Sequence, residues 1–296
     1  MIETNKLIWI NGEIVEEAKF LISPMSNTLH YATGIFDGIM AYFDKKTKSF
    51  NIYLGTEHFN RLLNSSKYFN YNIPFNEDVL INATLRLLKE SRVTCNCYIR
   101  PIIFRSNADL NLSINKKTSK ECLAISISRM PDNLIMNYKC LITEVERLSS
   151  KSIPIHLKSC ASYTNSYLAR KYAKDKDFDD GFMIDPNGNI TEISTANVFF
   201  IDKNQKICTP KLSGYVFPGL TRTKVCSILK ESGIDYEENE IHKSNMNQYT
   251  GAFLSATFKE ISPIININNI ELDTLSNEVY NEILDEFKKS IYGSGQ

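Results

Sequence analysis

The sequence lacks several features that would assign a function directly. Its formal net charge is zero, with 34 basic and 34 acidic residues among 296. It has no basic, aromatic-rich stripe of the kind that neutralises a nucleic-acid backbone, so we expect no nucleic-acid partner. No stretch approaches the ~20 apolar residues that a membrane-spanning helix needs, and the N-terminus has no long apolar core. We therefore expect a cytoplasmic protein with no membrane partner.

Cysteines and histidines are few and poorly spaced for a metal site. The seven cysteines are an odd number at irregular spacings, which favours reduced thiols over a disulfide framework. Cys95 and Cys97 form one C-x-C pair, but no second pair completes a four-ligand site. The four histidines show no H-x-x-x-H spacing, so we predict no metal. No G-x-G-x-x-G follows a predicted strand, which excludes a nucleotide-binding Rossmann protein.

The chain is long enough, and at 43% hydrophobic residues apolar enough, for one large or two medium domains. In the first half, Asn11-Gly12 predicts a hairpin turn between two apolar runs. For the same half we also predict a hairpin over 39–54, helices over 56–69 (capped by Thr56) and 76–91, and strands at 97–104 and 121–128. For the second half we predict a strand at 140–148, hairpins over 181–193 and 197–210, and helices over 162–176, 221–233 and 275–292.

The stretch 129–138 contains Pro, Asp and Asn, has no clear period and is the best domain boundary. We predict an N-terminal α/β domain over 1–128, an interdomain loop over 129–138 and a C-terminal α/β domain over 139–292. The tail 293–296 is predicted to be disordered.

Two charged side chains could carry chemistry. Lys158 stands between the apolar run "IPIHL" and the small polar "SCAS", and its amine could form a Schiff base with an aldehyde cofactor. A solvated charge at a strand end is the alternative. Glu192 ends a buried type of strand, where a carboxylate is costly unless it is paired, for instance with a protonated pyridine ring. A surface hairpin is the alternative for Glu192.

Two further segments could contact a ligand. Pro218 and Gly219 precede a helix that opens at Leu220 and Thr221, whose free N–H groups either bind an anion or are simply capped. The small residues 255–257 would let a ligand approach the backbone closely, although a tight strand-end turn explains them equally well.

The strand at 97–104 carries a third candidate. Its two-residue period puts Tyr98 and Arg100 on one face, and Pro101 marks the strand as an edge or a bulge. An edge strand with a phenol and a guanidinium on one side could receive a carboxylate. A solvent-facing pair is the alternative.

Taken together, these segments resemble the fold type IV, or class IV, pyridoxal-phosphate enzymes, and most of all the branched-chain amino acid aminotransferases. The matching segments are "TLHYATGIFDGIMAY", "HFNRL", "YIRPIIF", "IPIHLKSCASY", "EISTANVFF", "FPGLTR" and "LSATFKEISP". The resemblance implies a two-domain α+β fold of the D-amino acid aminotransferase-like type, with a small N-terminal and a larger C-terminal domain. It also implies a homodimer or dimer-based hexamer that transaminates leucine, isoleucine and valine with 2-oxoglutarate, as in branched-chain amino acid biosynthesis.

The resemblance implies a role for each matching residue. Lys158 would be the catalytic residue, holding pyridoxal 5'-phosphate covalently and moving the substrate α-proton. Tyr163 would bind the phenolic oxygen of the cofactor, and Glu192 its ring nitrogen. The phosphate would be held by Arg61, Leu220, Thr221 and Thr257. The substrates, an amino acid and a 2-oxo acid, would be bound by Phe36, Tyr31, Tyr98, Arg100, Ala256 and Phe258, with Tyr31 reaching across a dimer interface.

The pattern and the resemblance disagree about Arg61, because helical periodicity places it opposite Phe59 on a solvated face. Several residues also depart from the family's usual ones. Ala256-Thr257-Phe258 replaces Gly-Thr-Ala, Asp37 replaces a glutamate, and Met40 replaces an arginine. The segments for the cofactor match the family, whereas the segments for the substrate are altered.

Two other enzymes with the same fold remain alternatives. D-amino acid aminotransferases and 4-amino-4-deoxychorismate lyases share the lysine, glutamate and phosphate segments. The D-specific enzymes resemble one another in an Arg-x-His motif that residues 104–112 lack, and the lyases usually lack the Tyr-x-Arg-Pro found at 98–101.

Overall fold

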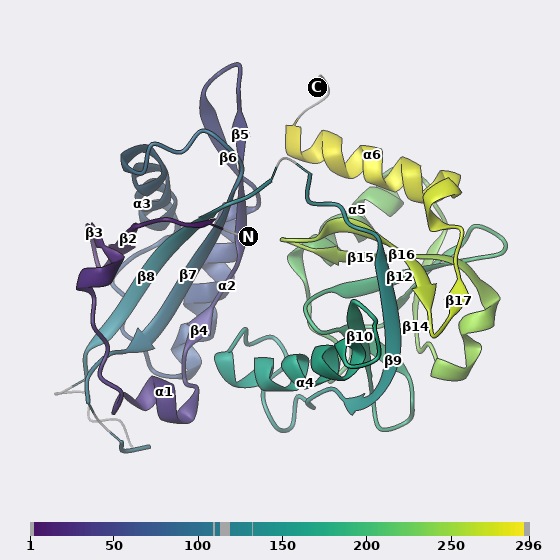
Figure 1. Cartoon of the computed structure of the whole chain (residues 1–296), viewed down its shortest axis with the longest axis horizontal. Helices are drawn as coiled ribbons and strands as arrows, with labels where there is room; N and C mark the ends of the chain where they lie inside the picture. The colour runs from purple at the N-terminus through teal and green to yellow at the C-terminus, as the bar shows by residue number, and fades with distance from the viewer. Residues whose placement is uncertain (1–2, 109, 113–118, 132, 293–296) are drawn as a thin grey trace. The chain divides into compact units, whose positions relative to one another are not determined.

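The computed structural model describes residues 3–108, 110–112, 119–131 and 133–292. The chain divides into two units, each drawn in Figure 1. Unit 1 is Met1–Asn133 with Leu157–Ala161, and unit 2 is Leu134–His156 with Ser162–Gln296. The division at Asn133 falls within the predicted connection 129–138, but the domain prediction did not include the return of Leu157–Ala161 to unit 1. The predicted disordered tail 293–296 lies outside the described residues.

Unit 1 is an antiparallel sheet with two long helices. Its strands are β1 (Glu3–Thr4), β2 (Leu7–Ile10), β3 (Glu13–Glu16), β4 (Ile35–Phe36), β5 (Ile39–Asp44), β6 (Ser49–Ile52), β7 (Cys97–Arg105) and β8 (Glu121–Arg129), and its helices are α1 (Asn27–Tyr31), α2 (Gly55–Tyr68) and α3 (Glu77–Glu90). The strand order is β3-β2-β8-β7-β5-β6, with β1 on β8 and β4 on β7. The core joins Phe59 and Leu62 of α2 and Leu80 of α3 to the strands, so both helices bury their apolar stripe against the sheet.

The hairpins and helices predicted for this half are confirmed, with one error at a helix start. Asn11 and Gly12 have φ values of 47° and 107°, the left-handed pair that a type I′ turn requires. The predicted cap at Thr56 is wrong, because α2 begins at Gly55 and the cap position is Leu54, at a φ of 51°.

The prediction that Tyr98 and Arg100 lie on an edge strand is wrong. β7 pairs with β8 on one side and with β4 and β5 on the other. Pro101 marks no bulge either, because β7 pairs with β8 without a register shift, and Pro101 faces the point where the neighbouring chain passes from β4 to β5. Its carbonyl accepts from the Asp37 N–H at 3.0 Å, and its missing N–H falls at this interruption of the ladder.

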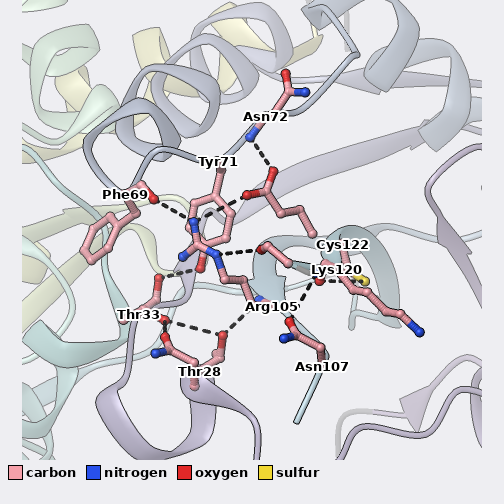
Figure 2. Close-up of polar contacts among 12 residues, drawn as sticks. Thr28, Thr33, Phe69, Tyr71, Asn72, Arg105, Asn107, Lys120 and Cys122 are labelled. Atoms are coloured by element: carbon pink, nitrogen blue, oxygen red, sulfur yellow. Dashed lines mark hydrogen bonds and ion pairs between the residues drawn. The ribbon is translucent and has the colours of Figure 1, made fainter. Parts of the chain in front are cut away.

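A buried arginine ties the end of β7 to its surroundings (Figure 2). Arg105 is 2% exposed, and its guanidinium carbon lies 4.0 Å from the ring centroid of Tyr71. The guanidinium donates to the Phe69 carbonyl at 2.7 Å and contacts Glu121 at 3.4 Å. A cavity of about 720 Å³ beside this cluster is lined by Lys67, Asn70, Tyr71, Asn72, Ser119 and Glu121. None of these is a predicted site residue.

Unit 2 is a larger, mixed sheet. Its strands are β9 (Tyr138–Glu146), β10 (Asp180–Ile184), β11 (Ile190–Ile193), β12 (Asn197–Asp202), β13 (Ile207–Pro210), β14 (Tyr236–Asn239), β15 (Tyr249–Ala256), β16 (Glu260–Ile267) and β17 (Ile270–Glu271), and its helices are α4 (Tyr163–Lys174), α5 (Leu220–Glu231) and α6 (Glu278–Tyr292). The order is β11-β10-β9-β16-β15-β12-β13-β14, and β9 is parallel to both β10 and β16. Helix α4 packs on β9 and β10, and α5 packs on β15 and α6 (Figure 1). Across the part of the chain that the structure describes, no helix combines the length and apolarity needed to cross a membrane.

Candidate active site

Lys158 belongs to unit 1 because its backbone pairs with the chain around β4. The Phe36 N–H donates to the Lys158 carbonyl at 3.1 Å, and the Cys160 N–H donates to the Gly34 carbonyl at 2.8 Å. These bonds hold residues 157–161 as an extra strand-like segment on the sheet. The Lys158 side chain is half-buried, and its Nζ lies 5.9 Å from the centroid of the Phe36 ring. Lys158 is therefore not a solvated strand-end charge.

Predicted substrate residues lie close to Phe36. The Arg100 guanidinium carbon is 4.7 Å from the Phe36 ring centroid, and Arg100 Nη2 donates to the Tyr98 hydroxyl at 2.9 Å. A Cβ at Gly38 would lie 1.9 Å from that hydroxyl, so only glycine permits this approach. The contacts join Phe36, Tyr98, Arg100 and Lys158 in one cluster with a cation beside apolar rings. Tyr31 lies apart on α1, where its hydroxyl donates to the Leu110 carbonyl at 2.6 Å.

Arg61 is held by a buried carboxylate. Its Nε and Nη2 donate to the two oxygens of Asp37 at 2.9 and 2.8 Å, and His58 Nδ1 lies 2.9 Å from Asp37 Oδ1. A carboxylate only accepts, so Nδ1 of His58 carries the proton. The Arg61 side chain is 14% exposed, so the solvated face predicted from helical periodicity is wrong. Helical periodicity could not predict this partner, because Asp37 lies outside α2, between β4 and β5.

Burial and charge act on this cluster in opposite directions. Burial by itself would raise the pKa of Asp37, but the Arg61 charge and the hydrogen bonds from Arg61 and His58 outweigh it, and the pKa falls far below its usual value. For His58, burial dominates over the attraction of Asp37 and lowers the pKa below 6.5. A neutral imidazole and a charged guanidinium therefore share one carboxylate at neutral pH.

In unit 2, Glu192 is buried at the end of β11 and has an ionic partner that the sequence analysis did not identify. Arg147, the residue after β9, donates from Nε to the Glu192 carboxylate. The second carboxylate oxygen accepts from Asn197 Nδ2 and from the Phe217 N–H, both at 3.2 Å. Glu192 is therefore not a surface hairpin residue. No local signal marked Arg147, because β9 itself carries charged residues up to Glu146.

The start of α5 lies against the same residues. Gly219 is its cap residue, no side-chain hydrogen bond caps the helix, and a Cβ at Gly219 would lie 2.2 Å from Asn197 Oδ1. Asn197 also pairs with Ser255 across β12 and β15. Among the described residues, the hydroxyls of Ser255 and Ser194 are buried without a hydrogen-bond partner. Buried polar atoms are normally satisfied, so this end of unit 2 fits a polar ligand.

The other predicted residues of unit 2 lie at element ends. Tyr163 begins α4 and is half-buried, Thr221 is buried in the first turn of α5 behind Leu220, and Ala256 ends β15. Residues 257–259, which include Thr257 and Phe258, form the turn from β15 to β16. In the ranges that the structure describes, no group of His, Cys, Asp and Glu could hold a metal ion.

The family model for the class IV amino-transferases matches residues 34–267. The chain belongs to this family. It is 31% identical over 266 residues to a protein named "probable branched-chain-amino-acid aminotransferase" from Aquifex aeolicus, covering 88% of this chain and 84% of that protein. A protein of the same name from Rickettsia bellii is 27% identical over 288 residues, covering 97% and 96%. The branched-chain aminotransferase of Thermobaculum terrenum, solved in its PLP form, has the same fold, with a TM-score of 0.89, 23% identity and coverage of 98% and 95%.

These matches confirm the predicted family, the two-domain α+β fold class and the assignment as an aminotransferase. The roles of the individual class IV residues remain predictions. The structure groups them within each unit, with Lys158, Phe36, Tyr98 and Arg100 in one cluster of unit 1. In unit 2, Glu192 and the start of α5 are joined through Asn197.

Proposed function

We propose that the chain is a pyridoxal-phosphate-dependent aminotransferase that converts L-leucine, L-isoleucine and L-valine to their 2-oxo acids, with 2-oxoglutarate accepting the amino group. The observation that carries the proposal is the position of Lys158. It lies on a segment paired to β4, half-buried beside Phe36, in a class IV aminotransferase. The names of the relatives from A. aeolicus and R. bellii support the substrate, and the PLP form of the T. terrenum enzyme supports the cofactor.

The residues present suit this cofactor. In unit 2, Glu192 would hold the ring nitrogen and Tyr163 the phenolic oxygen. The N–H groups of Leu220 and Thr221 at the uncapped start of α5, together with Thr257, would hold the phosphate. In unit 1, Arg61 would add a guanidinium to the phosphate. Bound pyridoxal 5'-phosphate supplies an electron sink for negative charge at the substrate α-carbon.

Residues of unit 1, with Ala256 and the 257–259 turn of unit 2, would act on the substrate. The Lys158 amine would hold the cofactor and then take and return the α-proton. Phe36, Ala256 and Phe258 would offer apolar surface to a leucine-like side chain. Tyr98 and the backbone around Thr257 and Phe258 would bind the α-carboxylate, and Arg100 would receive the distal carboxylate of glutamate. A cation packed on aromatic rings suits a pocket that alternates between an aliphatic and an acidic side chain.

The test is the variant Lys158→Ala, with Lys151→Ala as its control because Lys151 is an exposed lysine. Wild type and control should show the visible absorbance of lysine-bound cofactor, and borohydride should fix the label on residue 158 by peptide mass spectrometry. Lys158→Ala should lose both the label and transamination, and a variant that still transaminates would contradict the proposal. A panel of L-leucine, L-isoleucine, L-valine, D-alanine and aminodeoxychorismate separates the three candidate activities. Turnover of only the D-isomer or only aminodeoxychorismate would replace the substrate proposed here.

We also propose that the protein is a cytoplasmic homodimer or dimer-based hexamer. A group of exposed apolar residues surrounds α1 in unit 1, and hydrogen bonds from Asn27 and Tyr31 join its two segments: Leu21, Ile22, Met25, Leu29, Tyr31, Leu110 and Leu112. Large exposed apolar patches mark interfaces, and a second copy would cover this one. Light scattering of wild type and Leu29→Glu should show the variant dissociating, and a monomeric wild type would contradict the proposal.

A further inference from the structure

The turn from β15 to β16 buries a lysine. It occupies residues 257–259, and the pairing of Ala256 with Glu260 closes it. Glu260 has a φ of 49°, the left-handed residue that commonly follows a three-residue hairpin loop. Hairpin tips usually lie in solvent, yet Lys259 is 4% exposed. Thr257 and Phe258, which the proposed function assigns to the phosphate and the substrate, precede it directly.

Lys259 contacts two strands beyond its own hairpin. Its Nζ donates to Asp180 Oδ2 at 2.7 Å, and the two side chains are 5% and 0% exposed. The same Nζ lies 4.5 Å from the centroid of the Tyr138 ring. Because the strand order is β10-β9-β16-β15, the side chain reaches from the turn over the first residue of β9 to the first residue of β10.

The backbone of the turn is held as well. The Ser262 hydroxyl donates to the Lys259 carbonyl at 2.6 Å, and the Gly181 N–H donates to the other oxygen of Asp180 at 2.9 Å. Asp180 itself is fixed, since it pairs with Cys140 in the parallel ladder of β9 and β10. Both ends of the ion pair are therefore attached to the sheet.

Stability alone does not explain a buried ion pair here. Removing two charges from water costs about as much as their attraction returns, so an apolar pair of similar volume often gives equal or greater stability. The ion pair between the turn and β10 is directional, whereas apolar contact is not. It can therefore fix the position of the turn. The two residues that it fixes, Thr257 and Phe258, are the ones expected to face anionic groups.

We propose that Lys259 and Asp180 are positioning residues, whose ion pair holds the 257–259 turn in the conformation that binds the cofactor phosphate and the substrate carboxylate. This proposal rests on the proposed function. Such positioning matters because a small misplacement of binding groups can lower a rate by about 10²-fold without changing the groups themselves.

The test uses the double variant Lys259→Met/Asp180→Asn, which leaves no unpaired buried charge. Apoprotein is titrated with pyridoxal 5'-phosphate and with pyridoxal, which lacks the phosphate. We expect the double variant to bind pyridoxal 5'-phosphate about 10-fold more weakly, to bind pyridoxal within about twofold of wild type, and to raise KM for L-leucine more than it lowers kcat. A purely structural role would weaken both ligands alike. The matched control is Lys171→Met/Asp175→Asn, an exposed ion pair of the same unit, which should change neither constant.

Ser262→Ala is a second variant, and it retains all charges. It should also lower the affinity for pyridoxal 5'-phosphate relative to the affinity for pyridoxal, by a smaller factor than the double variant. An unchanged ratio of the two affinities in both the double variant and Ser262→Ala overturns the positioning role alone. A wild-type protein that binds no pyridoxal 5'-phosphate overturns the proposed function, and this proposal with it. The two failures are therefore distinguishable.

Discussion

Unit 1 and unit 2 each place a buried ion pair among the predicted cofactor residues, with the charges exchanged. In unit 1 the predicted ligand is the cation Arg61, and the carboxylate of Asp37 lies behind it. In unit 2 the predicted ligand is the carboxylate Glu192, and the cation Arg147 contacts it. Each predicted ligand therefore has a partner of opposite sign that can fix its orientation.

The two pairs differ in how the burial is shared. Asp37 is fully buried and Arg61 is 14% exposed, whereas Arg147 and Glu192 are 7% and 8% exposed. Asp37 also serves a second donor, His58, and the Gly38 N–H. Both carboxylates accept from several donors, but that of Asp37 is the more deeply buried, so its loss should affect the fold more than the loss of Glu192.

Replacing Asp37 by Asn should give the largest effect on stability. The amide leaves Arg61 without a counter-charge and cannot accept from all the present donors, so we expect a loss of about 3–5 kcal/mol in the free energy of unfolding. Urea unfolding of the apoprotein measures it. The control Glu90→Gln breaks an exposed pair with Arg86 in the same unit and should cost less than about 1 kcal/mol. A similar small loss for Asp37→Asn would show that the network is not what holds Arg61.

Replacing Glu192 by Gln should lower transamination by about 10²- to 10³-fold, the usual cost of removing one electrostatic contact to the reacting system. The amide is close in shape but cannot keep a bound pyridine ring protonated. The measurement is kcat with L-leucine at saturating cofactor. Glu144→Gln, in an exposed pair with Lys243, is the control in unit 2. Activity near wild type in Glu192→Gln would remove Glu192 from the site.

Features that depend on a few neighbouring residues were predictable from the sequence. Apart from the Thr56 cap, local signals were reliable: Asn11-Gly12 predicted a turn, and Pro218-Gly219 predicted the start of α5, because these depend on backbone geometry within a few residues. Of the two residues that the resemblance puts at the centre of the site, the structure buries Glu192 and half-buries Lys158. The resemblance also corrected the periodicity of α2, which put Arg61 in solvent.

The other errors and omissions arise from contacts between distant segments. β7 was taken as an edge because Pro101 lacks an N–H, and the break between β4 and β5 opposite it is visible only once the sheet forms. Arg147 and Glu192 are 45 residues apart, and Asp180 and Lys259 are 79 apart. No sequence periodicity connects residues so far apart. The partner of a buried charge therefore cannot be identified from a single sequence.

His58 gives the next largest effect and distinguishes unit 1, since no imidazole contacts Glu192 in the described residues. Burial lowers the pKa of His58 in the folded state, so below pH 6.5 the unfolded chain binds a proton that the folded chain does not. Stability should therefore fall with decreasing pH, by up to about 1.4 kcal/mol per pH unit, until the folded pKa is reached. Urea unfolding at pH 7.5 and 5.5 measures the slope. His58→Asn keeps a donor for Asp37 and should lose this component, whereas an equal slope in both proteins would assign it elsewhere.

Replacing Ser255 should have the smallest effect on the fold. It separates residues that stabilise the apoprotein from residues that would contact a ligand. The Ser255 hydroxyl is buried without a hydrogen-bond partner in the described residues, opposite Asn197 on β12. Ser255→Ala should leave the stability of the apoprotein within about 1 kcal/mol, because no bond is broken and an unsatisfied polar atom is removed. The same variant should weaken pyridoxal 5'-phosphate binding by about 3- to 10-fold, the worth of one hydrogen bond. Thr223→Ala, on the exposed side of α5, is the control. A stability loss without any change in cofactor affinity would mean that the Ser255 hydroxyl serves the fold and not the ligand.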